Sequence, residues 1–582
     1  MTADFDFIIA GGLLITTILS AKSLTIASGG TSGCLLANRL ANAATRPSVL
    51  LIEAGGEAIG DTIRPPFYRF MNAFMRPDLD HGYSTTKQPL LNDRSIRYIR
   101  GKALGGSSVL NFMAYVYGSG EDYNRWGELV GDDSWRWEKT KELFKRIENY
   151  NTTAASSYPQ YANPSAAEHG QKGLVNVSLP PVLEKGVAIA LDAMDKFGIG
   201  PRNLDLNSGD PVGVGIFPSS YGGDGRTTSA IAHLANTPDN LTIWSNSTVS
   251  RFILDGKKVL GVELVDGRQA MSKKDVILSA GAFDSPKLLL LNGIGPADEL
   301  GAHGINVVHD LPGVGKNLQD HMLVFLTIEV DPSLTEKDAF ESDAAKIAQA
   351  QEQWLKDRTG PFTLHNATLF GGFPKLPRLA ESAEFKALDK GLQAHLSKPT
   401  VPSYEIAGSA PIFPLGFQLA AGSASLTLVA FLMNPLSQGE VTLRSADHHD
   451  APVIDPKYME HPYDRKSMLE AIREVVTYIR ESELKKYFKR FIYGPASTSD
   501  EDIQEFMKEA LDTVWHANGT VKMGKPEDPN ACVSPDFRVY GMEGLRVVDM
   551  SVSPLTPNNH TQTTAYLVGQ KAADTIIAEY QL

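Results

Sequence analysis

The chain has 582 residues, 42% of them hydrophobic and 21% charged, which predicts an ordinary globular protein of more than one domain. Its formal net charge of -13 argues against nucleic acid as a partner, because no local cluster of Lys and Arg offsets the repulsion from a phosphate backbone. Cys34 and Cys532 are the only cysteines, too few for a disulfide framework or a zinc site, and we expect no metal.

The apolar segment from Phe7 to Leu19 has the composition of a signal-peptide core but the wrong flanks. Asp4 and Asp6 precede it without any Lys or Arg, and the segment is too short to span a bilayer. We therefore expect a soluble protein without a membrane span, in the cytoplasm or another intracellular compartment. Sequons such as Asn151-Thr152-Thr153 leave secretion open.

Two segments near the N-terminus join into a nucleotide-binding pattern. Residues 6–11 predict a buried parallel strand that enters a Gly turn, and residues 29–33 predict a second Gly turn at the start of a helix. Residues 48–56 predict another buried strand with an acid at its end. Such glycines let the backbone approach a pyrophosphate, and the acid binds a ribose hydroxyl. The predicted cofactor-binding residues of this pattern are Gly11, Gly30, Thr31, Ser32, Gly33 and Glu53.

The two halves of this pattern are separated by an apolar insert, residues 12–28. In one interpretation residues 7–10 are the first strand and the insert loops out; in the other, residues 24–27 are the strand and Ser28 replaces the first Gly. The first is favoured, since Phe-Ile-Ile-Ala suits a strand buried on both faces and Gly11 supplies the tight turn. The insert has no helix caps and only one charge, Lys22, which fits a translated intron.

Two Gly-rich stretches resemble the signatures of a known family. Residues 101–113 read GKALGGSSVLNFM, and residues 279–295 read SAGAFDSPKLLLLNGIG, with Asn292 where Ser is usual. Both are similar to signatures of the glucose-methanol-choline (GMC) oxidoreductases, which are FAD-dependent alcohol oxidases and dehydrogenases. Further matches, in the family's order, are residues 311–321 (LPGVGKNLQDH), 515–520 (WHANGT) and 545–554 (LRVVDMSVSP). Within the family, the chain resembles the branch of aryl-alcohol oxidases and alcohol dehydrogenases.

The resemblance implies an α/β fold: an FAD-binding, Rossmann-like domain with a parallel sheet, interleaved in sequence with an α+β substrate-binding domain with an antiparallel sheet. Residues 1–320 are expected to be mainly FAD-binding, with a substrate-domain excursion at about 151–215. Residues 321–535 are expected to be mainly substrate-binding, and residues 536–582 to return to the FAD domain. Candidate residues for the wall of the substrate site are Phe325, Phe362, Phe413, Phe417 and Trp515.

The cofactor implied by the resemblance is FAD. Some relatives tether the flavin through a His, and Leu110 occupies that position here, which implies non-covalent FAD. The resemblance places Val249 near the adenine and Asp549 near the pyrophosphate. The remaining residues that it assigns to the cofactor are Ser107, Asn111, Phe112, Met113, Ala114 and Gln562.

His516 and His560 lie at the ends of predicted elements, one after a helix at about 500–511 and the other before a helical run that ends near Ile577. By themselves, two such histidines are more often structural. Oxidising an alcohol on a flavin requires a base beside the ring, and His suits this role because its pKa lies near neutrality. By the resemblance, His516 is the expected base and His560 its hydrogen-bonding partner.

The expected reaction is oxidation of a hydrophobic primary alcohol, aryl or polyketide-like, to an aldehyde, with O2 or another oxidant as electron acceptor. Two alternatives stay open. One is an FAD-containing non-redox lyase or cyclase of the same family. The other is an inactive, flavin-free product, because the insert at residues 12–28 interrupts the phosphate loop.

Overall fold

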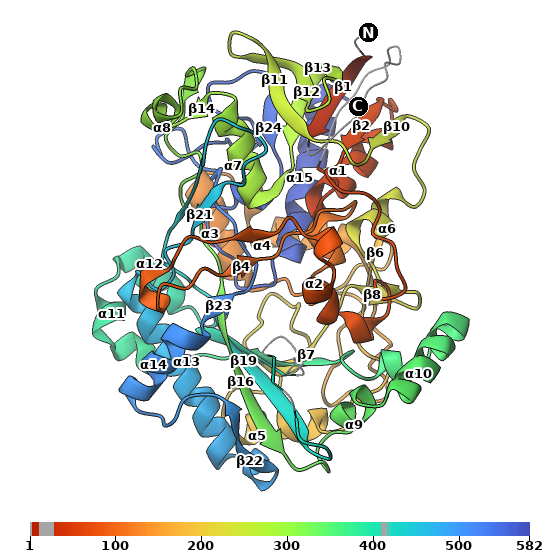
Figure 1. Cartoon of the computed structure of the whole chain (residues 1–582), viewed down its shortest axis with the longest axis vertical. Helices are drawn as coiled ribbons and strands as arrows, with labels where there is room; N and C mark the ends of the chain where they lie inside the picture. The colour runs from red at the N-terminus through yellow and green to blue at the C-terminus, as the bar shows by residue number, and fades with distance from the viewer. Residues whose placement is uncertain (1–2, 11–27, 409–415, 418) are drawn as a thin grey trace.

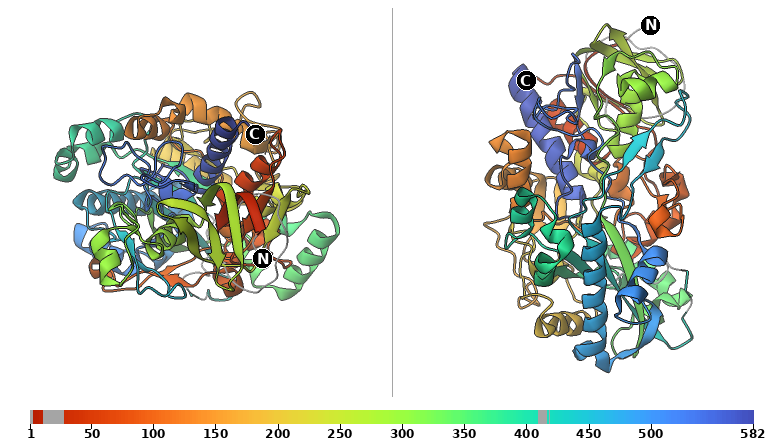
Figure 2. Two further views of the ribbon diagram at one scale, coloured as in Figure 1. Left: turned by 90° about the horizontal axis from the view of Figure 1, so that it is seen from above. Right: turned by 90° about the vertical axis from the view of Figure 1, so that its left-hand side faces the viewer.

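The computed structural model describes residues 3–10, 28–408, 416–417 and 419–582 of the chain. It contains two large β-sheets, one in the upper and one in the lower half of the view in Figure 1. The molecule is elongated, and the chain returns to the upper sheet with its last helix (Figure 2). Both sheets therefore draw strands from distant parts of the sequence.

The upper sheet has seven strands in the described part of the chain, in the order β10-β2-β1-β13-β12-β11, with β24 also paired to β13. Pairing is parallel from β10 to β13 and to β24, and antiparallel from β13 to β11. The strands are β1 (Ala3–Ala10), β2 (Val49–Ile52), β10 (Leu241–Trp244), β11 (Val249–Asp255), β12 (Lys258–Leu264), β13 (Gln269–Leu278) and β24 (Leu545–Val547).

Residues 7–10 form a strand, as the first of the two interpretations predicted. The strand β1 includes residues 7–10, and its Ile8 pairs in parallel with Val276 of β13 and with Leu50 of β2. Gly11 and the alternative strand at residues 24–27 lie outside the described residues. Residues 241–278 form a parallel strand, β10, followed by the antiparallel strands β11 to β13.

Helices of the upper half bring the ends of the chain together. The helix α1 (Thr31–Ala41) packs against α15 (Gln562–Tyr580) and α6 (Ser229–Leu234). Gly569 of α15 permits this approach, because an added Cβ would lie 2.8 Å from the carbonyl oxygen of Ser32. The first residues of α1 and α15, Thr31 and Gln562, line the same cavity. The helix α7 (Gly281–Leu291) follows β13.

The lower sheet also has seven strands among the described residues, all antiparallel, in the order β22-β16-β19-β18-β17-β7, with β23 paired to β16. Its strands are β7 (Gly213–Phe217), β16 (Met322–Val330), β17 (Leu369–Phe373), β18 (Tyr404–Gly408), β19 (Ala424–Leu432), β22 (Phe488–Tyr493) and β23 (Asp512–Thr513). With one sheet mainly parallel and the other antiparallel, the predicted α/β fold class is confirmed. The domain boundaries stay a prediction.

The helix α14 leads directly to the predicted catalytic loop. Ser499 caps its N-terminus by accepting a hydrogen bond from the backbone N–H of Asp502, and the acidic residues of the first turn stabilise that end of the helix dipole. The helix spans Asp500–Ala510 and is followed by β23, which pairs with β16. The loop that begins at Trp515 is thus attached to the lower sheet.

The remaining elements lie around these two sheets. The other α-helices are α2 (Met71–Met75), α3 (Gly120–Val130), α4 (Trp137–Ile147), α5 (Val187–Phe197), α8 (Ala297–Ala302), α9 (Lys337–Glu341), α10 (Ala344–Asp357), α11 (Ala383–Lys386), α12 (Lys390–Leu396) and α13 (Pro462–Glu481). The short strand pairs are β3 (Tyr83–Ser84) with β4 (Arg97–Tyr98), β5 (Glu148–Asn151) with β6 (Val175–Ser178), β8 (Tyr221–Gly222) with β9 (Gly225–Arg226), β14 (Ile294–Gly295) with β15 (His309–Asp310), and β20 (Glu440–Thr442) with β21 (Val453–Asp455).

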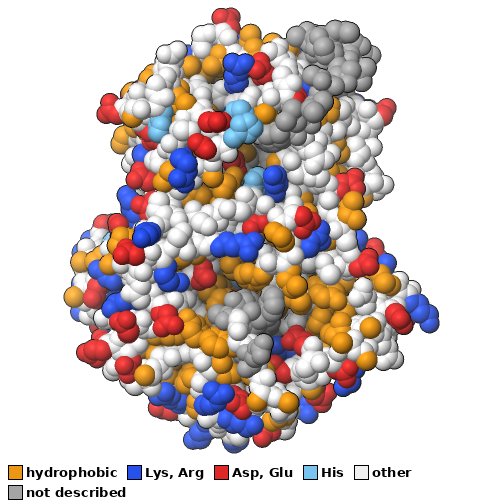
Figure 3. Space-filling model, viewed as in Figure 1, with side chains coloured by type: hydrophobic (Ala, Val, Ile, Leu, Met, Phe, Trp, Pro, Cys, Tyr) orange, Lys and Arg blue, Asp and Glu red, His pale blue; other side chains and the backbone are white. Residues whose placement is uncertain are grey.

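Of the helices in the described ranges, none combines the length and the hydropathy that a membrane crossing requires. Acidic and basic side chains are interspersed over the face shown in Figure 3, and hydrophobic side chains gather around a hollow in its lower half.

Candidate active site

Two adjoining cavities lie where the loops of the two sheets meet. The first, called here the histidine cavity, is lined by His516 and His560 and has a volume of about 130 Å³. The second, the glycine cavity, is lined by Gly30 and Glu53 and has a volume of about 380 Å³. Residues that line both are Thr31, Arg100, Gly101, Ser107, Met550 and Ala565. The shared lining shows that the two cavities lie side by side.

The glycine cavity collects most of the residues predicted from the nucleotide pattern. Gly33 is buried inside α1 and is not part of the lining, and Gly11 lies outside the described residues. The predicted cofactor residues that line this cavity are Gly30, Thr31, Ser32, Glu53, Val249 and Asp549; Ser107 lines both cavities.

The geometry of the glycine cavity fits a dinucleotide. A Cβ on Gly106 (φ +52°) would lie 2.6 Å from the Cα of Gly30, so only glycine allows the two loops to approach. No side chain caps the N-terminus of α1, which leaves backbone N–H groups for an anion. The hydroxyl of Ser279 lines the cavity and is buried without a hydrogen-bond partner among the described residues.

Two acids in the glycine cavity have different surroundings. Glu53, at the end of β2, accepts hydrogen bonds from the backbone N–H groups of Gly29 (2.7 Å) and Gly55 (2.8 Å), and burial raises its pKa to about 8. Asp549 accepts from the N–H of Gly281 (2.9 Å) and the hydroxyl of Ser285 (2.6 Å), and burial raises its pKa as well. Asp549 thus orders the turn before α7, whereas Glu53 orders the glycine loop.

The loop that carries His516 is held by hydrogen bonds from distant side chains. Trp515 has a positive φ of 59°, an uncommon conformation for a bulky residue, and its carbonyl accepts from Arg100 Nη1 at 2.7 Å. The backbone N–H of His516 donates to Asp320 Oδ1 at 2.8 Å, and that of Ala517 donates to the hydroxyl of Tyr98 at 2.8 Å. These contacts fix the direction of the His516 side chain.

The imidazole of His516 is bonded to a second, fully buried histidine, His321. The Nδ1 atoms of the two rings lie 2.9 Å apart, and Nε2 of His321 lies 3.1 Å from the carbonyl oxygen of Met433. A carbonyl only accepts, so the single proton of neutral His321 is on Nε2. Nδ1 of His321 must then accept from His516. The consequence is that His516 carries its proton on Nδ1 and a lone pair on Nε2.

The surroundings of this pair keep both rings neutral. Burial lowers the pKa of His321 to about 3, with a further contribution from the nearby His560. Burial also lowers the pKa of His516 well below its usual range, and His321, His560 and Arg100 act in the same direction. The neutral state that the hydrogen-bond pattern requires is therefore the state expected near pH 7.

The structure corrects one expected contact of His560. Its ring is 5.3 Å from that of His516, centroid to centroid, in a T-shaped arrangement, and the hydrogen-bonding partner of His516 is His321 instead. His560 Nε2 lies 2.9 Å from Oε1 of Glu405, a buried carboxylate on β18. The two histidines therefore face one cavity with different polar partners.

The residues that the family resemblance assigned to the flavin lie together in the histidine cavity. Asn111 Nδ2 donates to Gln562 Oε1 at 2.6 Å, and the guanidinium of Arg226 donates to the backbone carbonyl of Asn111 at 2.7 Å. Met113 has a positive φ of 62° and is fully buried. The assigned residues that line this cavity are Ser107, Asn111, Phe112, Met113, Ala114 and Gln562.

The wall of the histidine cavity is partly different from the expected one. Trp515 lines it, whereas Phe362 packs in a separate cluster against Phe67, Phe340 and Trp354. Phe325 is buried in the core, Phe417 is exposed beside Tyr493, and Phe413 lies outside the described residues. The apolar wall is formed by Ala73, Ile99, Leu110, Phe112, Leu323, Phe431, Val514, Trp515 and Met550.

Sequence reasoning missed three polar residues of the site. His321 ends the motif at residues 311–321, so its position in a matched signature was an available signal. Glu405 is the only charged residue of the strand Tyr-Glu-Ile-Ala-Gly (β18), and a lone acid in a buried strand calls for a partner. Arg100 precedes the first Gly-rich signature, but nothing local indicates that it contacts the loop at Trp515.

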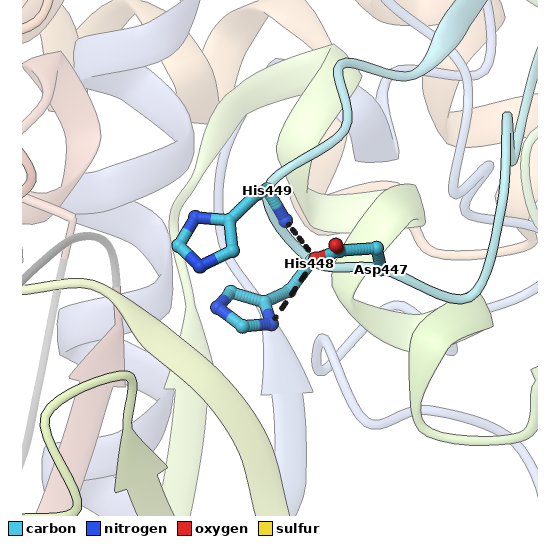
Figure 4. A group of neighbouring side chains, drawn as sticks. All are labelled: Asp447, His448 and His449. Atoms are coloured by element: carbon cyan, nitrogen blue, oxygen red, sulfur yellow. Dashed lines mark hydrogen bonds and ion pairs between the residues drawn. The ribbon is translucent and has the colours of Figure 1, made fainter.

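Within the described ranges, one group of side chains has the composition of a metal site. Asp447, His448 and His449 are consecutive, and one ligand atom from each lies within 4.8 Å of the others. Figure 4 shows them on one turn, with the backbone N–H of His449 donating to Asp447 Oδ1. This bond and the contact of His448 with Asp447 explain the cluster without an ion, so we assign no metal to it.

The fold and the site together define a dinucleotide-binding oxidoreductase, and comparisons identify its family. Two GMC oxidoreductase family models match residues 5–323 and 435–569. An alcohol dehydrogenase [acceptor] of Pseudomonas putida is 32% identical over 571 residues, covering 96% of each chain. The chain belongs to the GMC oxidoreductases.

Solved structures agree with this membership. Formate oxidase of Aspergillus oryzae superimposes with a TM-score of 0.87 at 27% identity, covering 100% of this chain and 99% of that one. A fungal aryl-alcohol oxidase gives a TM-score of 0.83 at 26% identity and covers 100% of both chains. The chain is accordingly an oxidoreductase with FAD as its cofactor, which the glycine cavity fits.

Proposed function

We propose that this enzyme oxidises a hydrophobic primary alcohol to an aldehyde, with His516 as the base. The observation that carries the proposal is the lone pair on Nε2 of His516, which follows from the hydrogen bonds of His321 to His516 and to Met433. His516 lines the cavity, and Nε2 makes no hydrogen bond to any described residue. A base must be unprotonated and exposed to substrate, and this nitrogen meets both conditions.

In the proposed reaction, the cofactor and individual residues of the chain have separate roles. Bound FAD would supply the acceptor for the hydride from the alcohol's carbon. The hydroxyl proton moves to Nε2 of His516, and the Nδ1 hydrogen bond to His321 keeps the ring oriented during the transfer. The residues that would hold the cofactor are Thr31, Glu53, Asn111 and Gln562, since they line the two adjoining cavities.

The substrate class is inferred from the wall of the histidine cavity. Phe112 and Trp515 meet edge to face, with ring centroids 5.6 Å apart, and Phe74 contacts both. Such a wall offers apolar area and few hydrogen bonds, which favours an aryl or other hydrophobic alcohol over a sugar. The similarity to an aryl-alcohol oxidase and to an alcohol dehydrogenase supports the same class.

The test is anaerobic flavin reduction in a stopped-flow spectrometer. Aryl alcohols should bleach the flavin of the wild-type protein, and glucose should do so far more slowly. His516→Gln should slow bleaching by about 10² to 10⁴-fold, the usual contribution of a general base, without loss of bound flavin. His365→Gln is the matched control, because His365 is buried outside the cavity and bonded to Glu184.

Each possible result of this experiment tests one of the alternatives. An unchanged bleaching rate in His516→Gln removes this residue as the base. Flavin that no alcohol bleaches, in a protein that retains it, favours a non-redox lyase or cyclase. Purified protein without flavin absorbance indicates the inactive, flavin-free product. The rate of reoxidation in air then distinguishes an oxidase from a dehydrogenase that needs another acceptor.

A further inference from the structure

A buried carboxylate, that of Asp320, contacts the loop that carries His516. Asp320 is 3% exposed, and its Oδ1 accepts from the backbone N–H of His516 at 2.8 Å. Its Oδ2 accepts from the hydroxyl of Tyr458 at 2.6 Å and from the hydroxyl of Thr513. The Thr513 hydroxyl in turn accepts from the backbone N–H of Trp515 at 2.8 Å. Asp320 therefore binds His516 directly and Trp515 through one intervening hydroxyl.

The residue after Asp320 binds the ring of the same histidine. Nδ1 of His321 lies 2.9 Å from Nδ1 of His516, and the carbonyl of His321 accepts from the backbone N–H of Val514 at 3.2 Å. Two consecutive residues thus bind the backbone and the side chain of His516. Because a misplacement of about 1 Å can lower a rate by about 10²-fold, the direction of Nε2 depends on both contacts.

The contacts of Asp320 suit its ionised form. Each of its three partners donates a hydrogen, and an ionised carboxylate only accepts. Hydrogen bonds to an ionised acceptor are roughly twice as strong as those between neutral groups. A proton on Oδ1 would compete with the N–H of His516. A proton on Oδ2 would be donated to Tyr458 or Thr513, and that hydroxyl would have to turn its own hydrogen away. Protonation therefore weakens the network at either oxygen.

The surroundings of Asp320 place its change of charge in a measurable pH range. Burial raises the pKa of Asp320 to about 6, and the hydrogen bonds that it accepts oppose this shift. Burial lowers the pKa of His516 well below its usual range, with His321, His560 and Arg100 acting in the same direction. As the pH falls, Asp320 is therefore protonated before His516.

The other titratable groups around Asp320 are two tyrosines and one acid. Burial raises the pKa of Tyr98 and that of Tyr458 well above the usual range, so both hydroxyls stay neutral. Asp512, on β23, has its pKa raised to about 6 by burial, and the charge of Asp320 contributes to this shift. Its Oδ1 accepts from the backbone N–H of Thr513 at 2.7 Å. Asp512 is thus a second acid whose titration has to be distinguished from that of Asp320.

We infer that Asp320 is a positioning residue whose ionised form holds His516 in place, so that protonation of Asp320, and not of His516, sets the acid limit of the reaction. The inference rests on the proposed function, in which Nε2 of His516 takes the hydroxyl proton. When Asp320 takes up a proton, its hydrogen bond to the N–H of His516 weakens, and the lone pair on Nε2 is no longer aimed at the substrate. The rate is therefore full where Asp320 is ionised and falls below that range, although His516 is still unprotonated.

The pH profile of anaerobic flavin reduction at saturating alcohol tests this inference. Between about pH 5 and 8, the wild-type rate should fall below about pH 6 with the uptake of one proton. Asp320→Asn, whose amide resembles the protonated acid, should be slower by roughly 10-fold or more at pH 8 and should not vary with pH over this range. An unchanged fall in rate at low pH in Asp320→Asn would overturn the inference.

Tyr458→Phe separates positioning through charge from a merely structural role. The variant removes one donor to the ionised carboxylate, so the fall in rate should move to higher pH by about one unit. A structural role alone predicts a lower rate at every pH and no displacement. A slower Tyr458→Phe enzyme with the wild-type pH profile would therefore overturn the inference, even where Asp320→Asn fails to fold.

Two further variants serve as controls. Asp464 is fully buried outside the histidine cavity and accepts from the hydroxyl of Ser437 at 2.6 Å and from its backbone N–H at 2.7 Å. Asp464→Asn changes the same chemical group in similar surroundings and should keep the wild-type profile. Asp512→Asn should also keep the fall in rate, displaced only to lower pH, because a neighbouring negative charge is removed. Loss of the fall in Asp512→Asn would assign it to Asp512 and overturn the inference.

NMR of holoenzyme labelled with ¹³C at the aspartate carboxyls follows the charge without turnover. The signal that is absent from Asp320→Asn, or displaced in Tyr458→Phe, belongs to Asp320 and should titrate with the same apparent pKa as the rate. A signal that stays ionised while the rate falls would overturn the inference. If His516→Gln reduces the flavin at the wild-type rate, the proposed function fails whatever Asp320 does. If His516→Gln is slow and Asp320 does not titrate with the rate, only the present inference fails.

Discussion

At the scale of single residues, Glu53 joins the strand β2 to the glycine loop. Its two carboxylate oxygens accept from the N–H groups of Gly29 and Gly55, and its pKa is raised to about 8 by burial. Hydrogen bonds to the ionised form oppose this shift, but burial dominates. Ribose hydroxyls would add donors to the same carboxylate and so favour its ionised form.

The raised pKa of Glu53 predicts a pH dependence of stability in the cofactor-free protein. The folded state holds the proton more tightly than the unfolded state, whose pKa is about 4.5. This contribution to stability is therefore present below pH 4.5 and is lost as the pH rises to about 8, at up to about 1.4 kcal/mol per pH unit. The Glu53→Gln variant, whose amide mimics the protonated acid, should not lose this stability as the pH rises. Urea unfolding of both proteins between pH 5 and 8 measures the difference, and parallel pH profiles would contradict it.

At the scale of secondary-structure elements, the connection from β1 to α1 is the unusual feature. The strand β1 ends at Ala10, and α1 begins at Thr31 with uncapped N–H groups beside Gly30. Gly29 is packed tightly, because an added Cβ would lie 2.8 Å from Leu104 Cδ2. The second half of the phosphate loop is thus held by its contacts with Leu104 and Glu53.

Deleting residues 12–28 should raise FAD occupancy, solubility and activity together. The flanks then join as Ile9-Ala10-Gly11-Gly29-Gly30 without a missing residue, so adjacent N–H groups can point at one pyrophosphate. The deletion also removes apolar residues such as Leu13 and Ile15. Flavin absorbance per protein, before and after incubation with excess FAD, is the measurement. Equal flavin content in both proteins would mean that the insert leaves the loop intact.

The nucleotide sequence tests the origin of the insert separately. A translated intron requires GT at the codon of Gly12 and AG at the junction of Ser28 and Gly29. Codons that lack either dinucleotide would exclude an intron and leave the insert as an evolved loop.

At the scale of the whole molecule, the site is shared between the two sheets. Glu53 and Gly30 are attached to the upper sheet, while Leu323, Phe431 and Glu405 belong to β16, β19 and β18 of the lower sheet. A ligand that fills both cavities would contact residues attached to both sheets. Its binding energy is therefore coupled to the stability of the whole chain rather than of one domain.

Removing FAD should destabilise the protein as one unit. At 100 times its dissociation constant, a ligand specific for the folded state adds about 2.7 kcal/mol to the free energy of unfolding, so a melting scan should shift up on FAD addition. FMN lacks the adenosine part that we propose Glu53 and Val249 to contact, and it should shift the melting temperature less. Equal shifts from FAD and FMN, or none, would argue against a cofactor held from both cavities.

The sequence by itself determined the features that lie within one short, contiguous segment. The strand at residues 7–10, the helix from Thr31, the acid at Glu53 and the loop of His516 each lie within short segments, because glycine turns and buried strands have local signals. The family signatures extended this to the residues that the resemblance assigns to the flavin, which line the histidine cavity as a group.

Only the tertiary structure decided which polar groups meet. His321 and His516 are 195 residues apart, and Glu405 and His560 are 155 apart. The local sequence pattern predicts that a strand such as β18 is buried. It does not predict which distant group contacts Glu405, the one acidic residue of that strand. The proton positions of His321 and His516 follow from their pairing, since the carbonyl of Met433 only accepts and so fixes the proton of His321 on Nε2.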